Sequence, residues 1–201
     1  MVVFHILEYG MAMNLSPQDV VVVLKLLAAG SKSWTYAQLG EELALSPSQV
    51  FRSVDRAEAV RLLEPGFLTL PPPPPDWPSQ DRPVLPSRTN RANLKEFLIH
   101  GVKYAFPVHR GGIVRGIPTA HAAPPLKQQI AESFDPPPVW PDASGSVRGV
   151  EFSPLYKNVP AAARRDNKLY ELLALVDAIR DGRAREREIA IRELTTRIDE
   201  R

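Results

Sequence analysis

The sequence contains no cysteine among its 201 residues. Structural disulfides, thiolate zinc sites and cysteine nucleophiles are therefore excluded, and we expect a protein of the reducing cytoplasm. No apolar run approaches the roughly 20 residues that a membrane-spanning helix needs, so we expect no membrane partner. The first 13 residues contain all three methionines and lack the basic region and cleavage site of a signal peptide. We interpret them as an N-terminal extension, with Met11 and Met13 as alternative starts of translation.

A strong overall charge is also lacking, because the formal net charge is only +2. The charge is nevertheless uneven, since eight basic side chains between residues 82 and 127 accompany a single acidic one, Glu96. These basic residues are Arg82, Arg88, Arg91, Lys95, Lys103, Arg110, Arg115 and Lys127. Such a local excess can bind phosphate, which responds to the local field more than to net charge. An ordinary solvated basic face explains the same composition, so both interpretations stay open here.

The 21 prolines divide the chain into segments. Five consecutive prolines at 71–75 exclude a helix or an interior strand and predict a stiff extended loop. Residues 129–163 are rich in Pro, Ser and Asp and predict a linker or covering loop. Residues 164–201 predict two amphipathic helices joined at Asp181-Gly182. This C-terminal helical hairpin is expected to serve in a dimer or partner contact, or as a packing cover.

The segment 16–62 has the residue pattern of a helix-turn-helix behind a leading helix. Ser16-Pro17 begins an apolar leading helix that ends at Gly30, and Thr35 caps the next helix without the Glu of a full capping box. A third helix begins at Ser46-Pro47 and reaches about residue 62. Gly40 supplies the small residue where two helices cross, and Ala44 stands at the corner where glycine is commonest. The apolar residues Leu39, Leu43, Leu45, Val50 and Val54 are expected to hold the pair on the leading helix.

The third helix is a candidate for reading DNA. Its outward face is predicted to carry Ser48, Gln49, Arg52, Ser53 and Arg56. Gln can pair with adenine and Arg with guanine, while Ser reaches phosphates or bases. The alternative is a structural helical hairpin in a protein that does not bind DNA. The basic segment downstream favours DNA binding.

Residues 15 to about 108 resemble the winged helix-turn-helix domain of MarR-type and related bacterial transcriptional regulators. The resemblance rests on LSPQDVVVVLKLL, on YAQLGEELALSPSQVFRSVDRA and on a basic segment in place of the wing. It implies a mainly α fold with a small β wing (α+β), with the winged domain at residues 14–128. It also implies a DNA-binding set of Ser46, Ser48, Gln49, Arg52, Ser53, Arg56, Arg88 and Arg91. The last three would lie nearer phosphates. The proline run departs from the short hairpin of the family's wing.

The segment HRGGIVRGIPTAH, residues 109–121, is a candidate for an active site. A phosphate loop requires a lysine and a following helix, neither of which is present. A zinc site requires three or four ligands at compact spacing, and His109 and His121 have no carboxylate near them in the sequence. The chain has no GxSxG motif either. We therefore expect no enzyme activity, no catalytic or metal-binding residues and no cofactor.

Two functions remain open. The first is a sequence-specific double-stranded DNA-binding transcriptional regulator, a repressor acting as a homodimer because palindromic operators reward two-fold symmetry. The second is an antitoxin-like protein-interaction module. It would autoregulate its operon and bind a partner enzyme through the helices of residues 164–201.

Overall fold

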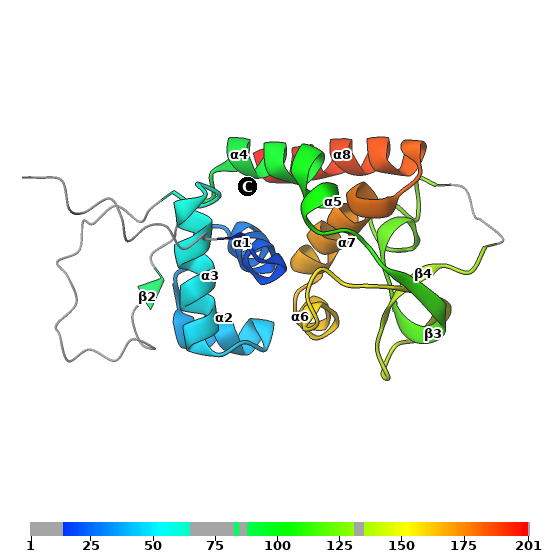
Figure 1. The fold of residues 1–201 in the computed structure, drawn as a ribbon, viewed down its shortest axis with the longest axis horizontal. Coiled ribbons are helices and arrows are strands. Elements are labelled where there is room, and N and C mark those ends of the chain that lie inside the picture. Colours follow the sequence, from blue (N-terminus) through cyan, green and yellow to red (C-terminus); the bar gives the residue numbers. More distant parts are fainter. Residues whose placement is uncertain (1–13, 65–82, 85–87, 131–134, 201) are drawn as a thin grey trace, which may run out of the picture.

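The computed structural model describes residues 14–64, 83–84, 88–130 and 135–200. Three helices come first, α1 (Pro17–Ala29), α2 (Tyr36–Leu43) and α3 (Pro47–Ala59). α1 is buried along most of its length and packs against α3, as its nearly all-round apolar pattern predicts. In Figure 1, α3 stands at one end of the long axis of the described fold, with α1 and α2 against it.

Local capping interactions set the beginnings of α2 and α3. The hydroxyls of Thr35 and Ser46 accept hydrogen bonds from the backbone N–H groups of Gln38 and Gln49, at 3.1 and 3.3 Å. The two glutamine side chains accept in return from the N–H groups of Thr35 and Ser46, at 3.0 and 2.9 Å. Both helices therefore begin with a complete capping box. The prediction that Thr35 lacks one is wrong, because Gln38 does what a Glu would do.

Two very short strands lie beside the helix-turn-helix segment. β1 (Trp34–Thr35) pairs antiparallel with β2 (Pro83–Val84), and Leu63 forms an isolated antiparallel bridge with Thr89. The chain therefore passes next to Leu63, just after α3, when it reaches Thr89. Between these two points, β2 lies next to β1. The predicted proline loop at 71–75 lies outside the described residues.

The next helical stretch is interrupted. α4 (Arg91–Glu96) passes into a π-helical turn, η2 (Phe97–Gly101), and then into α5 (Val102–Ala105). The π turn interrupts what would otherwise be one continuous helix. Leu94, Leu98 and Val102 are fully buried and attach this stretch to the core.

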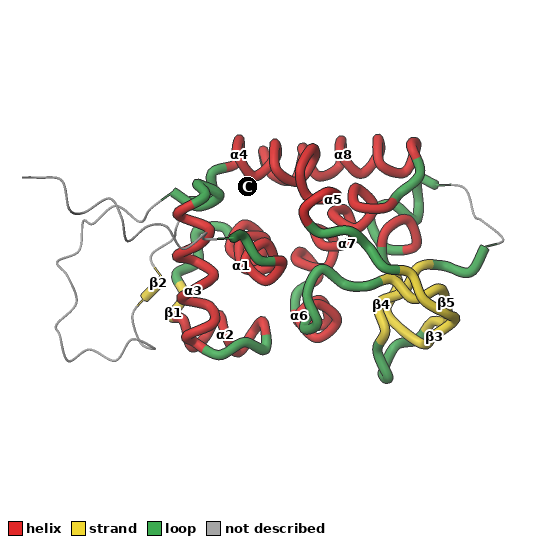
Figure 2. Tube along the Cα trace, viewed as in Figure 1, coloured by secondary structure: helices red, strands yellow, loops and turns green. Residues whose placement is uncertain are grey.

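A three-stranded sheet occupies the other end of the described fold (Figure 2). Its strands are β3 (Arg110–Pro118), β4 (Pro138–Pro141) and β5 (Val147–Phe152). β3 runs antiparallel to both others, and β4 and β5 pair in parallel to close the sheet. A 3-10 turn, η3 (Ala120–Ala122), follows β3.

The sheet corrects the predicted division of the chain. Residues 129–163 were expected to form a linker or covering loop, yet they contain β4, β5 and the helix α6 (Val159–Arg165). Prolines stand at both ends of β4, where they gave the appearance of a loop, while Val139 and Trp140 between them are fully buried. A boundary at residue 128 would also separate β3 from both of its partner strands.

The C-terminal hairpin is confirmed. α7 (Asn167–Asp181) and α8 (Ala184–Asp199) pack against each other on either side of Gly182. The apolar stripe of α7 is at most 1% exposed, at Leu169, Leu172, Leu173, Val176 and Ile179. The stripe belongs to the protein's own core, so it is not available to a second molecule. Of the alternatives for the hairpin, a packing cover matches this burial, and any partner contact would have to use its outer, charged side.

The fold is therefore mainly helical with a small sheet, an α+β architecture as expected. None of the described helices is both long and apolar enough to cross a membrane.

Candidate nucleic-acid interface

The corner between α2 and α3 requires small residues. Ala44 adopts a left-handed conformation with φ 53° and ψ 44°, which is uncommon for a residue with a Cβ. A Cβ added at Gly40 would lie 2.5 Å from the carbonyl oxygen of Leu45, closer than real Cβ contacts come. The N–H of Leu45 donates to the carbonyl of Gly40 at 2.8 Å. The two predicted roles, a small residue at the crossing and a turn-permissive one at the corner, are confirmed.

The N-terminal half of α3 presents three of the predicted DNA-binding residues to solvent. Ser46, Ser48 and Arg52 are exposed. Arg52 forms no hydrogen bond or ion pair with the part of the chain that the structure describes. Its neighbour Phe51 is 47% exposed and packs edge-on against Tyr36, with 5.6 Å between the ring centroids. This half of the helix can therefore offer a guanidinium, hydroxyls and an aromatic ring to a ligand.

Gln49 is only partly exposed, and its amide oxygen holds the N–H of Ser46 in the capping box. Pairing its amide with adenine would require breaking this cap. The structure therefore favours a role for Gln49 in starting α3 rather than in reading a base.

Ser53 does not face outward. Its side chain is fully buried, and its hydroxyl accepts a hydrogen bond from Nε2 of Gln18 at 2.7 Å. It lies on the helix face of Val50, Val54 and Ala57, as a spacing of three or four residues requires. The prediction that Ser53 contacts DNA is wrong.

Arg56 is also committed to the interior. Its Nε and Nη2 donate to the two carboxylate oxygens of Asp19, at 2.8 and 2.6 Å. Asp19 is fully buried in the first turn of α1, and the hydrogen bond with it raises the pKa of Arg56. The pair joins α3 to α1, so Arg56 positions the helix instead of reaching a phosphate as predicted.

Arg88 and Arg91 lie beyond the C-terminal end of α3. They line a cleft of about 710 Å³ together with Gly30, Ser31 and Glu64. Arg91 donates to the carbonyl oxygen of Asp199 at 3.2 Å. Glu64, which also lines this cleft, follows the end of α3 by five residues, whereas Ser48 lies in the first turn of the helix. The two arginines therefore do not join the exposed residues of α3 in a single site.

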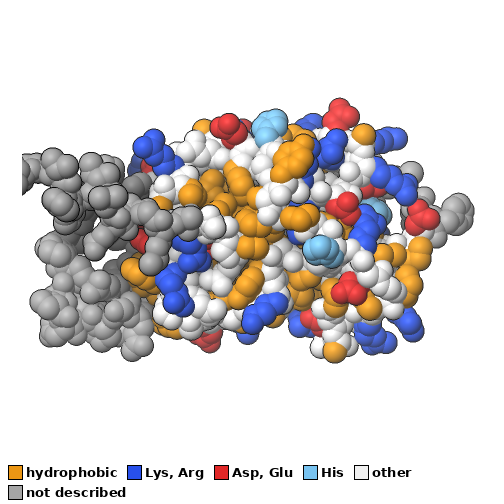
Figure 3. Space-filling model, in the orientation of Figure 1, with side chains coloured by type: hydrophobic (Ala, Val, Ile, Leu, Met, Phe, Trp, Pro, Cys, Tyr) orange, Lys and Arg blue, Asp and Glu red, His pale blue; other side chains and the backbone are white. Residues whose placement is uncertain are grey.

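Among the described residues, the basic excess predicted for residues 82–127 does not form one patch, and Arg82 lies outside those residues. Lys95 pairs with Asp199 at 2.7 Å and Arg110 with Asp181 at 2.6 Å, so acidic residues of the C-terminal hairpin neutralise part of it. Figure 3 accordingly shows Lys and Arg side chains scattered over the visible face among acidic ones. The positive electrostatic field that the sequence suggested for binding phosphate is therefore weaker in the folded protein.

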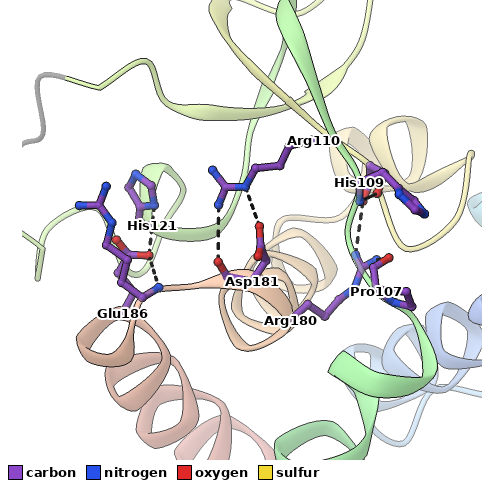
Figure 4. A network of polar contacts seen from close by, with 9 residues as sticks. Pro107, His109, Arg110, His121, Arg180, Asp181 and Glu186 are labelled. Atoms are coloured by element: carbon purple, nitrogen blue, oxygen red, sulfur yellow. Dashed lines mark hydrogen bonds and ion pairs between the residues drawn. The ribbon is translucent and has the colours of Figure 1, made fainter.

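A second polar centre lies within the C-terminal half. The fully enclosed carboxylate of Asp177 accepts hydrogen bonds from Thr119 at 2.8 Å, Trp140 at 2.6 Å and Arg180 at 2.7 Å. Burial raises the pKa of Asp177, and the charge of Arg180 and the hydrogen bonds act against this rise. Arg180 also donates to the carbonyl oxygen of Pro107 (Figure 4). Because Asp177 is 1% exposed, this centre joins elements of the core and offers nothing to a ligand.

His109 and His121, the two histidines considered as metal ligands, lie apart in Figure 4. Nδ1 of His121 is 3.5 Å from a carboxylate oxygen of Glu186, a neighbour contributed by α8 that the sequence did not reveal. The backbone N–H of His109 donates a hydrogen bond to the side-chain hydroxyl of Ser153 at 2.8 Å. Within the described ranges no group of three His, Cys, Asp or Glu side chains could hold a metal ion.

The C-terminal half supports the helix-turn-helix from behind, which the sequence did not predict. Lys25 of α1 is buried and pairs with Glu42 at 2.9 Å and with Asp166 at 2.8 Å. Asn158 donates to the carbonyl oxygen of Ala44 at 2.5 Å, and Arg165 donates to that of Glu41. The corner is thus held by Asn158, from the segment predicted to be a linker, and by Arg165, from the predicted hairpin.

Asp166 combines several of these interactions. Burial acts to raise the pKa of Asp166, but the hydrogen bond from Lys25 and those from the N–H groups of Leu169 and Lys168 outweigh it, so that the pKa is lowered. The carboxylate is therefore charged in the folded protein at neutral pH. It attaches α7 to α1.

Comparison with models of protein families, with curated proteins and with solved structures found no match.

Proposed function

We propose that the protein binds double-stranded DNA through α3 and acts as a transcriptional regulator. The observation that carries this proposal is the geometry of α2, the corner and α3. Gly40 permits the close crossing, Ala44 makes the left-handed corner, and Arg52 stands exposed in the first half of α3. A helix presented in this way is suited to the major groove, whose width admits an α-helix.

The order of elements beside α3 supports a winged form of the motif. A strand between α1 and α2 pairs with a strand after α3, and the bridge between Leu63 and Thr89 closes the base of the returning chain. This order matches the MarR-type resemblance of the sequence.

The proposed contacts are a revision of those expected from the sequence. Arg52, Ser48 and Ser46 approach the bases and nearby phosphates, and Arg88 and Arg91 approach more distant phosphates. Ser53, Arg56 and Gln49 hold α3 in place. A homodimer on a palindromic operator stays part of the proposal, with its contact on a surface other than the buried stripe of α7.

The test compares two arginines on one helix, about one turn apart. A labelled duplex from the DNA upstream of the protein's own gene is titrated at several salt concentrations. Arg52→Ala is expected to weaken binding about 5- to 150-fold, the loss of one good base contact, without changing the free energy of unfolding. Arg56→Ala is expected to lower that free energy, because it leaves the buried Asp19 without its cation.

Arg192→Ala, which removes an exposed arginine of α8, is the control and should bind as the parent does. If Arg52→Ala binds every duplex as tightly as the parent, α3 is not a recognition helix.

A further inference from the structure

Two arginines face each other on the sheet. In the antiparallel pairing of β3 and β5, Arg115 lies directly opposite Arg148, and both side chains are exposed. Directly opposite residues have Cβ atoms about 4.5–5.5 Å apart, and like charges in such a pair destabilise a sheet. Neither guanidinium has an ion pair with a carboxylate of the described residues.

The lack of a partner is unusual among the arginines around this sheet. Arg110 pairs with Asp181, and Arg164 pairs with Asp142 at 2.8 Å. Asp142 even donates its backbone N–H to the carbonyl oxygen of Arg115 at 3.1 Å, yet its carboxylate is held by Arg164. That carboxylate is therefore engaged by Arg164 and not by either arginine of the pair. The fold retains an uncompensated repulsion on this face.

The surroundings of the pair are open. Ile113 lies two residues before Arg115, so it shares the same face of β3, and it is 50% exposed. It stands opposite Val150. Neither the cleft of Arg88 and Arg91 nor the second cleft, next to His100, includes any of these residues. Small ligands need an enclosing cavity, whereas a chain of phosphates needs only adjacent cations on an open surface.

We propose that the arginine-pair face, defined by Ile113, Arg115, Arg148 and Val150, binds the phosphate backbone of a nucleic acid. Guanidinium groups donate in a fixed fork that matches phosphate oxygens, and a polyanion between the two removes their repulsion. The ligand class rests on the proposed DNA-binding function. The sheet and α3 lie at opposite ends of the long axis (Figure 1), so this face contacts a different stretch of nucleic acid from α3.

The experiment measures how DNA affinity depends on salt in the full chain. Each phosphate contact contributes about −0.9 to the slope of log affinity against log salt for duplex DNA. The double variant Arg115→Gln with Arg148→Gln should make this slope shallower by about 1.8. The matched control, Arg185→Gln with Arg192→Gln, removes two exposed arginines of α8 and should leave the slope unchanged.

A charge reversal separates ligand binding from folding. Arg148→Glu converts the repulsive pair into an attractive one, so its melting temperature should rise while DNA binding weakens and the slope becomes shallower. A slope equal to that of the parent in both sheet variants would overturn the inference. If that slope is unchanged while the parent binds polyglutamate and Arg148→Glu does not, the face accepts an acidic protein segment instead of nucleic acid.

The two proposals fail separately. If Arg52→Ala weakens binding and the sheet variants do not, only the arginine-pair face is refuted. If the sheet variants flatten the slope and Arg52→Ala has no effect, the recognition helix is refuted and the arginine-pair face stands.

Discussion

The two halves of the protein place their buried polar groups differently. In the helix-turn-helix half, two residues of α1 make separate contacts with α3: Gln18 donates to Ser53 and to the carbonyl oxygen of Gln49, and Asp19 pairs with Arg56. In the sheet-and-hairpin half, Thr119, Trp140 and Arg180 converge on the single carboxylate of Asp177. The first half can lose one contact and keep the other. The second half depends on the carboxylate of Asp177 in α7. This carboxylate joins α7 to Thr119, which follows β3, and to Trp140 of β4.

The largest effect is therefore expected from Asp177→Ala. This change leaves the guanidinium of Arg180, whose side chain is 3% exposed, without its counter-ion, and it leaves two more buried donors unpaired. Removing one partner of a buried ion pair costs about 3–5 kcal/mol. Urea unfolding at neutral pH should show a loss of this size in the free energy of unfolding.

Asp181→Ala is the matched control from the same helix. Asp181 is exposed and pairs with the exposed Arg110, so its loss should cost less than about 1 kcal/mol. Equal losses in the two variants would contradict the view that the C-terminal half depends on Asp177.

The helix-turn-helix half is expected to be sensitive at its corner as well as at the pair of Asp19 with Arg56. Gly40→Ala places a Cβ 2.5 Å from the carbonyl oxygen of Leu45, a backbone atom that cannot rotate away. Over-packing of this kind costs about 1–3 kcal/mol. Because α3 would have to move, duplex binding should weaken as well.

Gly112→Ala provides the comparison in the other half. A Cβ at Gly112 meets nothing within 4 Å, so thermal unfolding should change little. If Gly40→Ala were as stable as the parent, α2 and α3 would not cross as closely as the structure has them.

The same contrast explains what could be predicted from the sequence. The beginnings of α1, α2, α3 and α7 depend on caps within four residues of each start, so local patterns were sufficient. The sheet depends on pairing between β3 and strands more than 20 residues away, and the prolines of β4 concealed it. No local pattern reports such a pairing.

The candidate site was only partly predictable for a related reason. Ser48 and Arg52 were placed correctly on the exposed face of α3. Ser53 and Arg56 were not, because their partners Gln18 and Asp19 are polar residues in the first turn of a largely apolar helix. A polar side chain on α3 looks exposed unless its buried partner on α1 is known.

The smallest effect is expected where the two halves meet, at Asp166. Its carboxylate accepts from Lys25 of α1 and from the N–H groups that begin α7. Asparagine is an equally good cap, so Asp166→Asn removes mainly the charge next to Lys25. At pH 7 the variant should lose on the order of 1 kcal/mol of unfolding free energy.

The pH dependence of that loss provides the stricter test. The pKa of Asp166 is lowered in the folded protein, so its contribution is complete above the unfolded value near 3.9 and disappears as the pH falls through the folded pKa. Unfolding curves of the parent and of Asp166→Asn should therefore differ at pH 7 and converge as the pH falls through the lowered pKa of Asp166. A difference that stayed constant over this range would mean that the Asn side chain fits poorly and that the pair with Lys25 does not stabilise the junction.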